Sequence, residues 1–167
     1  LPNIGSMKTI LFCLFLSLQA LSQDLDSVRS LYKKAAESKE NTEKFYQYMS
    51  GFTEESATIR AYKAAAIALN AKFAEKINDK KELFTQGVAL LEKEILENPN
   101  NVEIRIIRLS IQQNRPKILK YNDRIETDKE FILRHFPSQS EEVKNYVLDY
   151  ARNTDAFTPS EKQKLGI

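Results

Sequence analysis

One segment of this sequence concentrates side chains that could bind an acidic partner. Arg105, Arg108 and Gln112 share one edge of a predicted helix, and further cations follow in a less regular stretch that ends at Arg124. Charged donors hold carboxylates and phosphates strongly, and Tyr and Arg are enriched at binding hot spots. The candidate sites for an acidic peptide, a phosphate or a sugar acid are Arg105, Arg108, Gln112, Arg115, Lys117, Lys120, Tyr121 and Arg124.

A structural role for the same cations is the alternative. Glu103, Glu126 and Asp128 are close enough in sequence to pair with them. The cations could also simply solvate the domain, where exposed pairs contribute little to stability. Both interpretations remain open from the sequence.

Residues for catalysis or metal binding are scarce. His135 is the single histidine, Cys13 is the single cysteine, and the four glycines are isolated. A catalytic triad would have to use His135, at a helix end where a structural role accounts for it equally well. The counts provide neither a multi-histidine metal site nor a phosphate-binding glycine loop. Adjacent carboxylates such as Glu141 and Glu142 occur in first turns of predicted helices, where the helix dipole accounts for them. We therefore expect no catalytic residue, no metal and no cofactor, and an enzyme is the least expected class.

The N-terminus has the features of a secretory signal peptide. After Met7 come one lysine, an apolar run from Ile10 to Leu18 and a small-residue stretch. This pattern predicts a signal peptide over 7–22, cleaved between Ser22 and Gln23, preceded by an expression remnant or upstream misread over 1–6. An uncleaved anchor is the alternative, but the apolar run is shorter than the roughly 20 residues that span a bilayer. The expectation is a periplasmic or secreted protein without cysteine.

Length and charge limit the class of protein further. The whole chain carries 25 Lys and Arg against 23 Asp and Glu in 167 residues. Nucleic-acid binders usually carry a marked basic excess, so nucleic acid is not an expected partner. About 145 residues after processing correspond to roughly one domain, so we expect a single all-helical domain over 23–167.

The helices that would position the basic residues meet at a turn over Asn98–Asn101, inside an apolar stretch from Leu83 to Ile111. The helix after this turn is apolar on two sides, which predicts that it is sandwiched between neighbours. Its two apolar sides are Val102, Ile106 and Leu109, and Ile104, Ile107 and Ile111.

Other helix starts are predicted from capping residues, and no strand pattern is found. An alanine-rich helix is expected from Thr53 to about Lys76. Predicted capping boxes are Asp79 with Glu82, Asp123 with Glu126, Ser138 with Glu141, and Thr158 with Glu161. The predicted fold is all-α, an irregular right-handed array of antiparallel helix pairs, with a compact helical bundle as the alternative.

Gly87, Leu91 and Pro99 have the spacing found in the second helix of a tetratricopeptide repeat, so residues 83–111 locally resemble that family. Glu94 departs from the pattern, which has a small residue there. The resemblance implies stacked helix pairs and a protein-binding scaffold. We therefore expect an exported interaction protein whose partner is another envelope or secreted protein. A small-ligand or anion-binding protein that uses the basic residues is the alternative.

Overall fold

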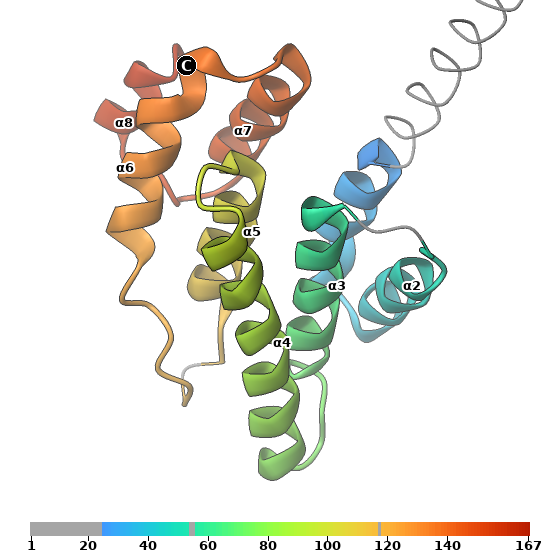
Figure 1. Ribbon diagram of the computed structural model, residues 1–167. Helices are drawn as coiled ribbons and strands as arrows, with labels where there is room; N and C mark the ends of the chain where they lie inside the picture. The colour runs from blue at the N-terminus through green and yellow to red at the C-terminus, as the bar shows by residue number, and fades with distance from the viewer. Residues whose placement is uncertain (1–24, 54–55, 117) are drawn as a thin grey trace, which may run out of the picture.

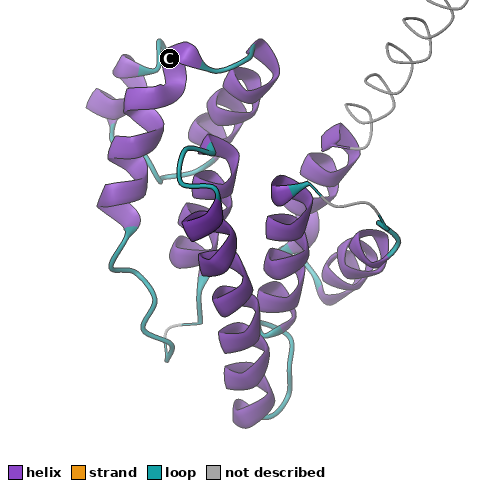
Figure 2. Ribbon diagram, viewed as in Figure 1, coloured by secondary structure: helices purple, strands orange, loops and turns teal. Residues whose placement is uncertain are grey.

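The computed structural model describes residues 25–53, 56–116 and 118–167, and in these ranges the regular structure is helical throughout (Figure 2). The predicted all-α class is confirmed. The proposed remnant over 1–6, the proposed signal peptide over 7–22 and Lys117 lie outside the described residues. A helix over 25–35 comes first. It is followed by α2 (Lys39–Ser50), α3 (Ala57–Asn70), α4 (Ile77–Glu97), α5 (Val102–Asn114), α6 (Ile125–His135), the 3-10 turn η1 (Phe136–Ser138), α7 (Glu141–Asn153) and α8 (Pro159–Lys164).

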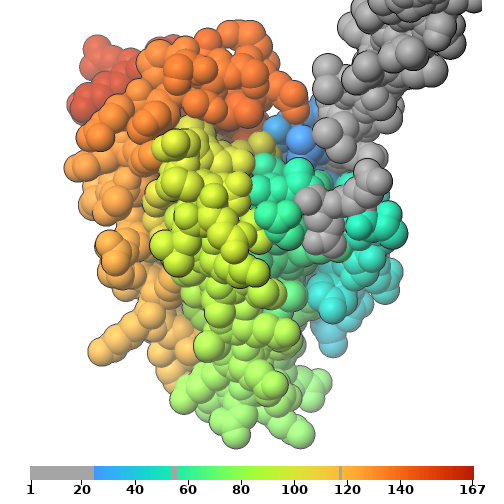
Figure 3. Space-filling view, viewed as in Figure 1, coloured from blue at the N-terminus to red at the C-terminus, as the bar shows by residue number. Residues whose placement is uncertain are grey.

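The helix α5 separates two apolar cores, as its two-sided pattern predicts. In the ribbon it lies between α3 and α6 (Figure 1), and in the space-filling view the C-terminal part of the chain lies on one side of α4 and the N-terminal part on the other (Figure 3). The α5 residues Ile104, Ile107 and Ile111 belong to a core formed with the helix over 25–35, α2, α3 and α4, which we call the N-terminal core. On the opposite side, Val102, Ile106 and Leu109 belong to the C-terminal core, which is formed with α6, α7 and the last residues of the chain. All six side chains are at most 3% exposed. Burial on both sides explains why α5 lacks a broad polar face.

The closest helix packing is between α3 and α4, because both present small residues at the crossing. A Cβ on Gly87 of α4 would lie 2.5 Å from the backbone N of Ala68 and 2.7 Å from the backbone O of Ala64. The two backbones are therefore nearly in contact. The helix α4 packs more extensively on α3 than on α5, the helix that follows it across the predicted turn.

Several helix boundaries differ from the predicted ones. The alanine-rich helix α3 begins after its cap Ser56 and ends at Asn70, so it is shorter than expected. Neither α4 nor α6 has a side-chain cap: they begin after Lys76 and Arg124, and the predicted boxes at Asp79 and Asp123 are wrong. Packing of long apolar faces holds these ends without a cap. Ser140 rather than Ser138 caps α7.

Two predicted boundaries are confirmed in detail. The side chain of Asn101 accepts a hydrogen bond from the backbone N of Ile104 at 3.1 Å, which begins α5. Thr158 and Glu161 form a complete capping box at α8. In each case the capping side chain satisfies a backbone N–H that the helix leaves without a partner.

Candidate functional site

The predicted basic residue Arg108 lies inside the fold, between α4, α5 and α6. Its guanidinium donates to Asp128 through Nε at 2.8 Å and Nη2 at 2.6 Å, and to Glu92 through Nη1 at 2.7 Å. Arg108 is 4% exposed and Asp128 is fully buried. Burial opposes the charge on Arg108, but the hydrogen bonds and charge of Asp128 raise its pKa well above the ordinary value. Arg108 is therefore a paired cation that joins three helices.

Asp128 is also the acceptor for the neighbours of Arg108 on the same edge. Arg105 donates to it at 3.2 Å and lies over the ring of Phe131 at 4.8 Å. Gln112 donates to it at 3.1 Å and accepts from the backbone N of Arg124 at 3.0 Å. The edge of α5 that was predicted to bind a partner therefore contacts Asp128 and holds the start of α6 against α5.

The remaining predicted residues divide between this network and the surface. Tyr121 donates to Glu92 and packs edge-on against Phe84, with ring centroids 5.8 Å apart. Arg115 donates to the backbone of its own helix, at the Gln112 carbonyl. Lys120 is exposed, and Arg124 is exposed beside Asp123. The structure therefore brings Arg105, Arg108, Gln112 and Tyr121 together around two carboxylates and leaves the outer cations apart from them.

A second buried ion pair uses the opposite edge of α5. Arg29 donates to both carboxylate oxygens of Glu103 at 2.8 Å, and Tyr62 donates to the same carboxylate at 2.8 Å. Glu142 of α7 also accepts from Arg29, at 2.5 Å. This network joins the helix over 25–35 to α3, α5 and α7. The charged groups on both polar edges of α5 are thus paired within the fold, and an open candidate site lies elsewhere.

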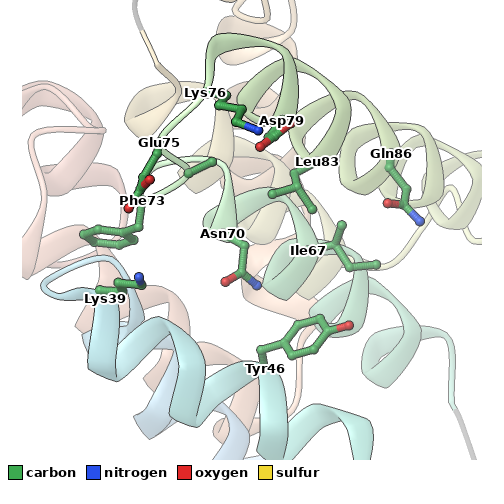
Figure 4. A pocket seen from close by; sticks show the side chains of 11 residues that line it. Lys39, Tyr46, Ile67, Asn70, Phe73, Glu75, Lys76, Asp79, Leu83 and Gln86 are labelled. Carbon is green, nitrogen blue, oxygen red and sulfur yellow. The ribbon is translucent and has the colours of Figure 1, made fainter.

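That site is a groove of about 640 Å³ between α2, α3 and α4 (Figure 4). Tyr46 on α2 lies across the groove from Leu83 and Gln86 on α4, with Ile67 and Asn70 of α3 between them. We call it the α2–α4 groove. It is lined by Lys39, Tyr46, Ile67, Asn70, Phe73, Ala74, Glu75, Lys76, Asp79, Leu83 and Gln86.

The lining combines partly exposed apolar groups with polar groups that are free to bind. Tyr46 is 45% exposed, and Ile67, Phe73 and Leu83 are half-buried. The amide of Asn70 donates to the Ala66 carbonyl at 3.0 Å, which leaves its own oxygen as an acceptor. Within the described ranges, five groove side chains make no hydrogen bond or ion pair: Lys39, Glu75, Lys76, Asp79 and Gln86.

The groove was not predicted from the sequence because its apolar residues resemble core positions. Phe73 and Leu83 continue the apolar patterns of the helices beside them, and Tyr46 sits beside the buried Phe45. Only the packing shows that α2 and α4 diverge and leave these side chains accessible. Three chain segments contribute, and no local motif links them.

The histidine considered for catalysis and metal binding has ordinary structural contacts, and Cys13 lies outside the described residues. His135 Nδ1 lies 2.9 Å from the Phe131 carbonyl oxygen, and its ring stacks on that of Phe131 with centroids 4.0 Å apart. In the part of the chain that the structure describes, no group of three or more His, Cys, Asp or Glu is placed to hold a metal ion. No described helix is long and apolar enough to cross a bilayer.

Comparison of the chain with protein-family models, with curated proteins and with solved structures finds no match.

Proposed function

We propose that this chain is a helical interaction protein that binds a short peptide segment of a partner in the α2–α4 groove. The observation that carries the proposal is the combination of an open, partly apolar groove with polar rim groups that have no partner of their own. Elsewhere, α5 has its charged groups paired and its apolar groups covered.

The chemistry of the lining favours a peptide. Tyr46, Phe73 and Leu83 offer a surface for one or two apolar side chains. The Asn70 and Gln86 amides can pair with a peptide backbone, which has both donors and acceptors. The volume lies within the range of about 300 to 1,000 Å³ that is usual for small-molecule pockets, so it suits an anchor side chain with its flanks.

The charges at the rim make an acidic or a basic polymer a poor occupant. Lys39 and Lys76 contribute two positive charges, and Glu75 and Asp79 contribute two negative ones. A segment with an aromatic or aliphatic anchor between residues of both charge signs would complement this rim. The local resemblance to tetratricopeptide repeats agrees with a protein-binding role.

As part of the same proposal, the protein is exported and its partner is an envelope or secreted protein. Its support is the signal-peptide pattern that begins at Met7. N-terminal sequencing of the native protein tests it, and a native chain that retains 7–22 would contradict it.

Selection from a random peptide library tests the binding role, with a matched pair of variants as the control. Leu83 and Leu90 both lie on α4, but only Leu83 lines the groove, and Leu90 is 43% exposed. Peptides that bind the unmodified chain should lose at least tenfold in affinity for Leu83→Ala and keep their affinity for Leu90→Ala, provided both variants melt as folded proteins. Equal binding to both variants, or no enriched peptide, would refute the proposal.

Binding of an anion by Arg105 and Arg108 is less well supported. An anion would have to replace Asp128, which is fully buried and accepts from both guanidiniums. Displacing one partner of a buried pair leaves an uncompensated charge and is costly.

A further inference from the structure

A second cavity lies between the helix over 25–35, α5 and α7, and it shares no residue with the α2–α4 groove. Its volume is about 360 Å³, at the lower end of the range for small-ligand sites. Four separate chain segments line it. The lining residues are Tyr32, Lys33, Ala36, Glu37, Leu69, Ser110, Asn114, Tyr146, Asp149, Tyr150, Asn153 and Thr154.

The most informative of these is Tyr32, whose side chain is buried while its hydroxyl lacks a partner. Tyr32 is 8% exposed, and its Oη makes no hydrogen bond of ordinary geometry. Burial raises the pKa of Tyr32 to about 12, and the nearby Ser110 side chain offsets this only in part. A buried polar group without a partner costs stability, and such groups are rare in folded proteins. The Tyr32 hydroxyl can therefore form a hydrogen bond with a ligand bound in the cavity.

The other polar groups of the cavity give it hydroxyls and amide oxygens but no free cation. Tyr150 donates to Gln113 at 2.9 Å, which leaves its oxygen able to accept. Asn114 donates to the Ser110 carbonyl at 2.9 Å, so its amide oxygen is available. Lys33 is paired with both carboxylate oxygens of Asp149, at 2.9 and 3.0 Å, and is neutralised by it.

From this arrangement we infer that the cavity binds a small uncharged polyhydroxy compound of the monosaccharide class. An anion would meet the carboxylates of Glu37 and Asp149 without a free cation. A purely apolar guest would leave the Tyr32 hydroxyl unsatisfied. A neutral sugar has hydroxyls that donate and accept, and it has a C–H face that can lie on the tyrosine rings and Leu69.

The tyrosine content of the chain provides a direct assay. There are seven tyrosines and no tryptophan, so a chain with isotope-labelled tyrosine rings gives a simple NMR spectrum. Titration with glucose, galactose and N-acetylglucosamine should shift the ring signals of Tyr32, Tyr146 and Tyr150 for at least one sugar. The signals of Tyr46 and Tyr48, which do not line the cavity, should stay unchanged.

Removal of single hydroxyls distinguishes a built site from weak surface contact. Tyr32→Phe removes a hydroxyl that makes no hydrogen bond of ordinary geometry, so the protein should stay folded while its sugar affinity falls roughly fivefold, the size of one net hydrogen bond. Tyr48→Phe is the matched control and should bind as the unmodified chain does.

The inference would be overturned if none of the sugars shifts the signals of the cavity tyrosines, which would mean that the cavity holds water only. It would also be overturned if Tyr32→Phe binds sugar as tightly as the unmodified chain, or if glucuronate binds more tightly than glucose. None of these results bears on peptide binding in the α2–α4 groove, so the two proposals fail separately.

Discussion

Truncation of Ile107 and of Ile106 tests whether α5 separates two cores. The two residues are neighbours in sequence, yet Ile107 packs in the N-terminal core and Ile106 in the C-terminal core, and both are 0% exposed. Substitution by Ala removes three buried carbons, worth about 2.4 kcal/mol at roughly 0.8 kcal/mol each, and the cavity that remains adds to this cost. Each single variant should therefore lose about 2 to 5 kcal/mol of unfolding free energy.

Urea unfolding followed by circular dichroism measures these losses. Ile118→Ala is the control, because Ile118 is 61% exposed and its truncation should change stability by less than about 0.5 kcal/mol. If either Ile106→Ala or Ile107→Ala stays within about 0.5 kcal/mol of the unmodified chain, one side of α5 is not buried, and the two-core description is wrong.

The other predictions concern single buried groups. Asp128→Ala leaves Arg108 buried without its main partner and should cost about 3 to 5 kcal/mol in urea unfolding, while the double variant with Arg108→Met should recover part of this loss. Gly87→Ala places a Cβ within 2.7 Å of the α3 backbone and should lower stability by at least about 1 to 3 kcal/mol, whereas a gain would show that α3 and α4 are not in close contact. Burial raises the pKa of Tyr32 from the ordinary 10.0 to about 12, so its hydroxyl ionises in the unfolded chain before it ionises in the folded one. The folded state should therefore lose unfolding free energy as pH rises from 10 to 12. Phenylalanine cannot ionise, so the pH-dependent loss of unfolding free energy in Tyr32→Phe should be smaller than that of the unmodified chain by roughly 2 to 3 kcal/mol.

The sequence was informative where one physical effect dominates locally. The spacing of the apolar residues of α5 predicts its two apolar sides, because each side packs in a core from which water is excluded. The capping box of Thr158 and Glu161 is equally local. These features depend on residues within a few turns of one another, so a pattern of spacing suffices to predict them.

Features that depend on distant partners were not predictable in the same way. Glu94, which departs from the repeat pattern, is 5% exposed because Arg60 of α3 pairs with both its oxygens at 2.8 Å. The sequence offered Asp128 as one possible partner of the basic residues, but it could not show that Arg105, Arg108 and Gln112 all converge on that carboxylate. Such contacts follow from how helices cross, and a single sequence does not specify a crossing.

The α2–α4 groove shows the same limit for the functional site. Tyr46 and Leu83 are 37 positions apart, and each alone has the character of an ordinary core residue. Their shared exposure arises because α2 and α4 both pack on α3 and not fully on each other. The basic residues form a local excess of positive charge that is visible in the sequence, whereas the groove carries balanced charge and no local sequence motif.

Amide chemical-shift mapping with a selected peptide tests peptide binding most directly. The chain labelled with nitrogen-15 would be titrated with the tightest peptide from the library, and the same titration would be repeated on Leu83→Ala. Peptide binding in the groove predicts perturbations centred on Tyr46, Phe73, Leu83 and Gln86 that weaken in the variant. Perturbations centred on Lys120 and Arg124, or a titration that Leu83→Ala leaves unchanged, would contradict it.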